Sequence, residues 1–126
     1  MERSVIYYHT ERGESPVQDF LESLSIKEQA KCLAYIEFLR GAQPHIPSHI
    51  AKKVEDELWE LRPEFGGTAF RFFYFLFLKD EVVLVHAFKK KTQQLKRSDI
   101  ELALRRVQQY RQDHEKDTKS GQSDEE

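Results

Sequence analysis

The sequence has little of what small proteins use as covalent or metal crosslinks, since Cys32 is the one cysteine among its 126 residues. One cysteine can form neither an internal disulfide nor a cysteine-rich zinc site. No apolar run reaches the length of a membrane span, and residues 1–4 are not followed by an apolar signal core. We therefore expect a cytoplasmic protein with no membrane partner. A glycine-rich phosphate loop and metal-ligand spacing are also missing, so we expect no cofactor and no metal site.

Apolar residues are plentiful enough for one packed core. The chain is 39% hydrophobic and has nine Phe, five Tyr and one Trp, which fits a single domain over residues 1–112. The charges are unevenly spread, with a net charge of −4 over residues 1–61, +6 over residues 62–111 and −4 over the rest. The basic segment could face a polyanion. Residues 113–126 are polar and acidic, and we expect a disordered tail there.

Two helices are expected after a first strand over residues 4–8. Ser15 is placed as an N-cap before Pro16, and apolar residues then recur at helical spacing up to residue 24. The segment from Ser25 to Glu28 has the pattern of a capping box and opens a second helix, which ends at Gly41. We interpret this pair as a helical hairpin.

The second half of the chain favours strands. Residues 42–56 show no sustained period and are interpreted as a loop, whereas residues 58–62, 70–77 and 81–88 have strand patterns. A last helix is expected from a capping box between Ser98 and Glu101. The order β-α-α-β-β-β-α predicts an α+β fold, with a mostly antiparallel sheet of about four strands and the N-terminal helical hairpin packed on one face.

The turn between the last two strands places candidate site residues on one sheet face. If residues 79–80 form a two-residue turn, Arg71 lies opposite Phe88 and Phe73 lies opposite His86. A three-residue loop would shift this register. Because an unpaired guanidinium is costly inside an apolar strand, Arg71 must reach either a carboxylate such as that of Glu60 or an open cleft.

Other cations follow at the same end of the sheet. Arg62 ends the neighbouring strand, and Lys89, Lys90 and Lys91 come directly after Phe88. A lysine run after a strand can be a solvated edge that deters aggregation, and this reading stays open beside an anion-binding one. His86 is either a satisfied half-buried histidine or an acid/base group.

Three further residues are weak candidates for chemistry. His45 and His49 lack a third ligand and the pattern of a zinc helix, which makes a metal site improbable. Cys32 has no strong cationic neighbour in the sequence, and we expect an inert thiol.

Three segments resemble a known family: residues 58–63 (LWELRP), 71–74 (RFFY) and 85–93 (VHAFKKKTQ). Together with the flanking helices they resemble the HigB-type, phage-derived branch of the RelE/ParE toxin superfamily. The resemblance implies a RelE-like fold and the toxin of a type II toxin–antitoxin system. It also implies a metal-independent endoribonuclease that cleaves mRNA on the ribosome. A cognate helix-turn-helix antitoxin is the implied protein partner.

The resemblance also implies roles for single residues. Arg71 matches the strand arginine that contacts the scissile phosphate, and His86 is an alternative acid/base. The basic residues after the last strand match catalytic cations of the family: Lys89, Lys90 and Lys91. Arg62 and Lys96 join these residues in the expected RNA-binding set.

Two other functions stay open at this stage. The ParE branch shares the fold but inhibits DNA gyrase by binding, without RNA cleavage. A catalytically inactive remnant would only bind the antitoxin. The cation cluster around Arg71 argues for the ribonuclease, because a phosphodiester transition state needs positive charge beside it.

Overall fold

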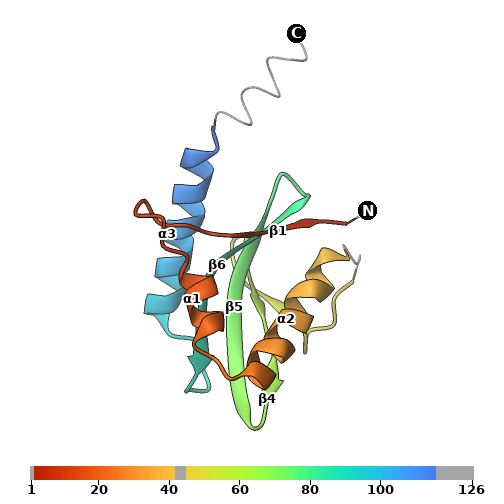
Figure 1. The fold of residues 1–126 in the computed structure, drawn as a ribbon. Coiled ribbons are helices and arrows are strands. Elements are labelled where there is room, and N and C mark those ends of the chain that lie inside the picture. The colour runs from red at the N-terminus through yellow and green to blue at the C-terminus, as the bar shows by residue number, and fades with distance from the viewer. Residues whose placement is uncertain (1, 42–44, 116–126) are drawn as a thin grey trace.

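The structure is a computed structural model that describes residues 2–41 and 45–115. Figure 1 shows the path of the chain through its helices and strands. Within the described ranges the elements are β1 (Ser4–Tyr7), α1 (Pro16–Glu22), α2 (Ile26–Arg40), β2 (Ala51–Glu55), β3 (Leu58–Leu61), β4 (Glu64–Phe65), β5 (Thr68–Phe77), β6 (Glu81–Lys90) and α3 (Arg97–Asp113). From residue 116 on, the expected acidic tail lies outside the described residues. None of the three helices described is long and apolar enough to cross a bilayer.

The sheet is mixed and has six strands, which corrects the expectation of about four mostly antiparallel ones. Its order is β1-β6-β5-β3-β2, with β4 paired to β5. β1 runs parallel to β6, while the other pairs are antiparallel. β2 lies in the segment that was expected to be a loop. The sequence did not reveal this strand, because Lys52 and Lys53 are both exposed at the sheet edge and leave no apolar alternation. The direction of β1 depends on a partner more than seventy residues away, which local patterns do not encode.

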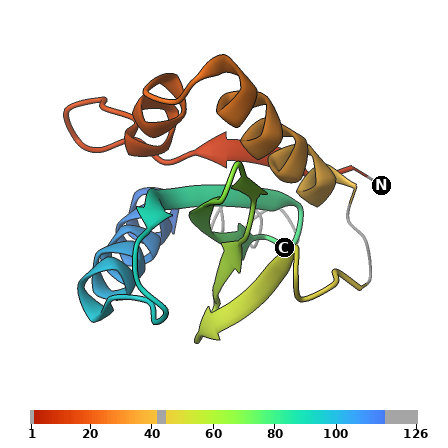
Figure 2. The same ribbon diagram turned by 90° about the horizontal axis from the view of Figure 1, so that it is seen from below.

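Helices cover both faces of the sheet, and this overturns the expected N-terminal helical hairpin on one face. Seen from below, α1 and α2 lie on one side of the sheet and α3 lies on the other (Figure 2). α1 rests mainly on β6, and α2 contacts β1 and β4 as much as it contacts α1. The helices themselves were predicted correctly. They pack on the sheet more than on each other, because the sheet offers most of the apolar surface.

Strand β5 explains why two helical layers are needed. Phe70 and Phe72 pack in the core beneath α1 and α2, whereas Phe73 and Phe75 pack in the core beneath α3. All four side chains are fully buried. Because β5 presents apolar side chains on both faces of the sheet, both faces must be covered by other elements. Helices α1 and α2 cover one face, and α3 covers the other.

The β5–β6 hairpin keeps the expected register by an unexpected route. Arg71 pairs with Phe88, and Phe73 pairs with His86, as predicted. The loop, however, has three residues between Phe77 and Glu81, and a shift between Phe73 and Tyr74 restores the alignment.

That shift is a β-bulge in β6, where Val85 has no partner on β5. Because of the bulge, two consecutive side chains, Val85 and His86, lie on the same face of the sheet, beneath α3. The backbone carbonyl of Val85 accepts a hydrogen bond of 2.8 Å from Nη1 of Arg106 on α3. The guanidinium thus satisfies a carbonyl at the point where the ladder is interrupted.

The helix caps follow the sequence only in part. Ser25 and Glu28 form the expected capping box. Ser15 occupies the N-cap position of α1, but its side chain makes no cap hydrogen bond. The capping box expected at Ser98 is absent, because α3 begins two residues earlier, with Lys96 in place of Ser98 as its N-cap. Asp99 is thereby free to contact the sheet instead.

We expect Ser25→Ala to lower the free energy of unfolding by about 1 kcal/mol, because it removes the acceptor for the Glu28 amide. Urea denaturation measures the change. Ser15→Ala is the matched control, since Ser15 has the same position in α1 without a cap hydrogen bond. Equal losses in the two variants would contradict the assignment of the cap.

Candidate functional site

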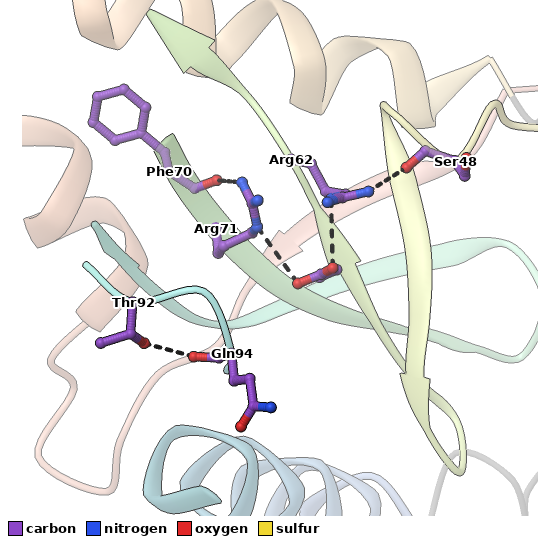
Figure 3. A network of polar contacts seen from close by, with 7 residues as sticks. Ser48, Arg62, Phe70, Arg71, Thr92 and Gln94 are labelled. Carbon is purple, nitrogen blue, oxygen red and sulfur yellow. Dashed lines mark hydrogen bonds and ion pairs between the residues drawn. The ribbon is translucent and has the colours of Figure 1, made fainter. Parts of the chain in front are cut away.

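A buried carboxylate lies between two arginines at one end of the sheet. Arg71 on β5 is 3% exposed and Glu60 on β3 is 5% exposed. Nε of Arg71 is 3.5 Å from Oε2 of Glu60, and Nε of Arg62 is 3.4 Å from Oε1. Figure 3 shows the contacts from Arg62 and Arg71 converging on this one carboxylate. Arg71 therefore reaches the carboxylate partner that its apolar strand required.

These ion pairs neutralise charge without forming hydrogen bonds. Their distances exceed those of charge-assisted N–H···O bonds. Oε2 of Glu60, Nε of Arg62 and Nε of Arg71 are buried, and none has a hydrogen-bond partner among the described residues. The guanidinium groups instead donate from Nη1 to backbone carbonyls, from Arg71 to Phe70 and from Arg62 to Ser48, each at 2.8 Å. The carboxylate is held by attraction and by its place in the sheet.

Lys90 adds a third cation to this cluster. It pairs with Ala69 and so shares the sheet face of Arg71. Burial lowers the pKa of Lys90, and the nearby Arg71 guanidinium lowers it further. Burial also lowers the pKa of Arg71, an effect that Glu60 opposes. Below we use "arginine cluster" for Glu60, Arg62, Arg71 and Lys90.

The three consecutive lysines, Lys89 to Lys91, do not all lie on the same face of the sheet. Lys89 pairs with Phe70, which packs beneath α1 and α2. The charge of Lys89 acts on Glu28 at the start of α2. The pKa of the Glu28 carboxyl is lowered mainly by the hydrogen bond from the Ser25 backbone amide and in smaller part by Lys89. Lys90 faces the opposite side, because neighbouring strand residues alternate.

A pocket of about 180 Å³ opens where β6 ends and α3 begins. The loop between them is closed by a 2.6 Å hydrogen bond from Oγ1 of Thr92 to the carbonyl of Gln94 (Figure 3). Basic residues dominate its wall, which includes a single acid. The lining residues are Phe88, Lys89, Lys90, Lys91, Thr92, Gln94, Lys96 and Asp99. All three lysines of the run and Lys96 contribute to the lining of this pocket, although Lys89 faces the α1–α2 side of the sheet, whereas Arg62 and Arg71 do not line it.

His86 lies on the Arg71 face but points to the start of α3. Its Nε2 is 2.8 Å from Oδ1 of Asp99, and its ring packs against Phe73 and Phe88, with centroids 6.0 and 5.3 Å away. Burial lowers the pKa of His86, although Asp99 opposes the shift. The lowered pKa favours the uncharged imidazole, in which Nε2 carries the proton because a carboxylate can only accept.

Several residues of this site were not expected from the sequence. Asp99 was assigned only to a helix cap, and Arg106 had no role at all. Glu60 was named only as a partner for Arg71. The sequence feature that indicated Glu60 was its position on a half-buried strand next to an apolar strand, because a buried carboxylate needs a cationic partner. Asp99 and Arg106 could not be found this way, because their partners lie on β6, and only packing of α3 brings them together.

The weak candidates lie apart from the lysine-lined pocket, but His49 lines another pocket with Arg62 and Glu64. His45 and His49 are exposed, and the described residues contain no group of three metal-ligating side chains. Cys32 is buried in α2, and burial raises the pKa of its thiol to about 12. Both features disfavour the reactive thiolate form of this cysteine.

Fold and site together define a small α+β protein whose mixed sheet gathers cations at one end. Residues 19–108 match the family model described as phage derived protein Gp49-like (DUF891), and the chain belongs to this family. The family is part of the RelE/HigB-like toxin group, which indicates the toxin of a toxin–antitoxin pair and an antitoxin as partner. No curated protein matches the chain.

His86 makes stability depend on pH. The pKa of His86 is lowered in the folded protein from its ordinary value of about 6.5. As the pH falls through this value, the histidine therefore takes up a proton more readily in the unfolded chain than in the folded one. The free energy of unfolding should therefore decrease between about pH 7 and pH 5. His86→Gln keeps an N–H donor for Asp99 and removes the titration, so it should lose less stability over this range.

Urea denaturation at several pH values measures this difference. His9→Gln is the control, since His9 is exposed, and it should follow the wild type. An unchanged pH dependence in His86→Gln would show that the histidine is not the responsible group.

Proposed function

We propose that this protein is the HigB-type toxin of a type II toxin–antitoxin pair, and that it is a cytoplasmic, metal-independent endoribonuclease. Its substrate is mRNA on the ribosome, and its protein partner is a helix-turn-helix antitoxin. The observation that carries the proposal is the arginine cluster beside a lysine-lined pocket. Guanidinium and ammonium groups stabilise the charge that develops on phosphate oxygens.

The proposed reaction is attack of a ribose 2′-oxygen on the adjacent phosphorus. A bond forms between O2′ and phosphorus, and the bond from phosphorus to O5′ breaks. The products are a 2′,3′-cyclic phosphate and a 5′-hydroxyl end. A base takes the 2′-hydroxyl proton, and an acid gives a proton to O5′.

The site supplies groups for each part of this reaction. Arg71 is proposed to bind two phosphate oxygens as a fork, with Arg62 beside it. Lys90, whose pKa is lowered by burial and by Arg71, is the candidate proton donor. His86 is the candidate acceptor, because its uncharged form is favoured and its Nδ1 has no proton when Nε2 donates to Asp99.

Other cations are proposed to bind the RNA chain. Lys89, Lys91 and Lys96 line the pocket with Lys90 and can neutralise neighbouring phosphates. Arg71 is buried, and on its face the rings of Phe73 and Phe88 pack against each other, so the proposed reaction needs help from outside the protein to align the reacting atoms. The ribosome is proposed to supply that alignment, since positioning by itself contributes many kcal/mol.

Cleavage of a defined mRNA, with and without translating ribosomes, tests the proposal when new 5′ ends are mapped. Wild type should produce ends only with ribosomes. Arg71→Lys keeps a cation beside Glu60 and loses the fork, so cleavage should fall by about 10- to 100-fold. Lys79→Gln is the control, because Lys79 lies at the opposite end of the β5–β6 hairpin.

Folding of each variant is checked by thermal melting. Wild-type protein that is folded yet yields no ends in either condition would overturn the ribonuclease. DNA supercoiling by gyrase would then test inhibition by binding, for which Arg71→Lys should be as active as wild type. Cleavage by wild type that Arg71→Lys leaves unchanged would remove Arg71 from the site.

A further inference from the structure

Arg71 is closed off from solvent in this structure. Only 3% of its surface is exposed, so a phosphate of RNA cannot reach its guanidinium without a change in side-chain position. Arg62, by contrast, has 27% of its side chain exposed, and Lys90 is half-buried. The arginine cluster therefore meets solvent through Arg62 and Lys90 and keeps Arg71 inside.

Arg71 is held by a 2.8 Å hydrogen bond from its Nη1 to the carbonyl of Phe70 and by an ion pair with Glu60, and the ion pair is weak. Nε of Arg71 is 3.5 Å from Glu60, and neither atom of this pair has a hydrogen-bond partner among the described residues. A phosphate would offer charge-assisted hydrogen bonds of about 2.7–2.9 Å. Exchange of the carboxylate for a phosphate thus replaces a long contact by short ones.

Glu60 also keeps a partner if Arg71 turns away. Its other oxygen, Oε1, is 3.4 Å from Nε of Arg62. Loss of the only partner of a buried charge costs several kcal/mol, but here one carboxylate serves two guanidinium groups. The second arginine lowers the cost of releasing the first.

We propose that Glu60 is a positioning residue that competes with RNA phosphate for Arg71. Its carboxylate holds the Arg71 guanidinium against β3 in the free protein, and a phosphate attracted by Arg62 and Lys90 displaces it. Glu60 thereby sets how tightly the site binds RNA. The inference rests on the proposed function for the identity of the anion.

Glu64 provides a matched control for the charge of Glu60. Both carboxylates act electrostatically on Arg71 and Lys90. Glu64, however, is exposed on β4, and among the described residues it forms no ion pair with Arg71. Replacing either acid by glutamine removes one negative charge from the neighbourhood, but only Glu60→Gln releases Arg71.

The experiment measures binding of a short single-stranded RNA whose 2′-hydroxyls are all methylated, so that it cannot be cleaved. Fluorescence anisotropy over a range of salt concentrations gives the affinity and its salt dependence. Glu60→Gln should bind about tenfold more tightly than Glu64→Gln. Its slope of log K against log salt should be steeper by about 0.7, the change expected for one more phosphate contact.

A double variant with Glu60→Gln and Arg71→Lys tests whether Arg71 makes that extra contact. Lysine cannot provide the fork, so affinity should return toward that of Glu64→Gln. Thermal melting confirms folding. Glu60→Asp is the second variant if Glu60→Gln does not fold, since it keeps the charge, withdraws the carboxylate, and should give a smaller increase in affinity.

Glu60→Gln, or Glu60→Asp in its place, with affinity and salt slope no greater than those of Glu64→Gln would overturn the inference. So would absence of RNA binding in both wild type and the Glu60 variants. Binding and cleavage are measured separately, so the two proposals fail separately. Wild type that does not cleave, with the expected change in Glu60→Gln, leaves an RNA-binding site without ribonuclease activity.

Discussion

The β-bulge in β6 is the constraint on which the candidate site depends. The three-residue loop between β5 and β6 would by itself pair Arg71 with Ala87, one residue out of the observed register. The bulge at Val85 corrects the alignment, and Arg106 of α3 binds its carbonyl. Arg71 and His86 share a face because the strand contains this extra residue.

Charge burial is the second organising feature. The arginine cluster collects positive groups around a single buried carboxylate. Glu60 offsets only part of the charge of its two arginines and leaves their Nε atoms without a hydrogen-bond partner among the described residues. Such a group stabilises the fold less than an apolar core would. The proposed anion-binding role accounts for such a cluster, because an incoming anion would accept the hydrogen bonds that the two arginines do not make here.

The sequence predicted the site in part. The alternation of β5 placed Arg71 among apolar residues, and this showed that it needed a carboxylate or a cleft. The last strand was expected to end at residue 88, whereas β6 continues to Lys90, so the sequence did not predict that Lys89 and Lys90 face opposite sides of the sheet. The His86–Asp99 contact was not readable, because Asp99 belongs to a helix whose packing against β6 no local pattern encodes.

The sequence alone determined the order of most elements, the Ser25 capping box, the apolar character of β5 and the basic segment, because each depends on residues a few positions apart. The tertiary structure alone decided the parallel pairing of β1 with β6, the edge strand β2, the helical cover on both faces and the arginine pair around Glu60. These features join segments distant along the chain. Their energies come from contacts that exist only after the sheet has assembled.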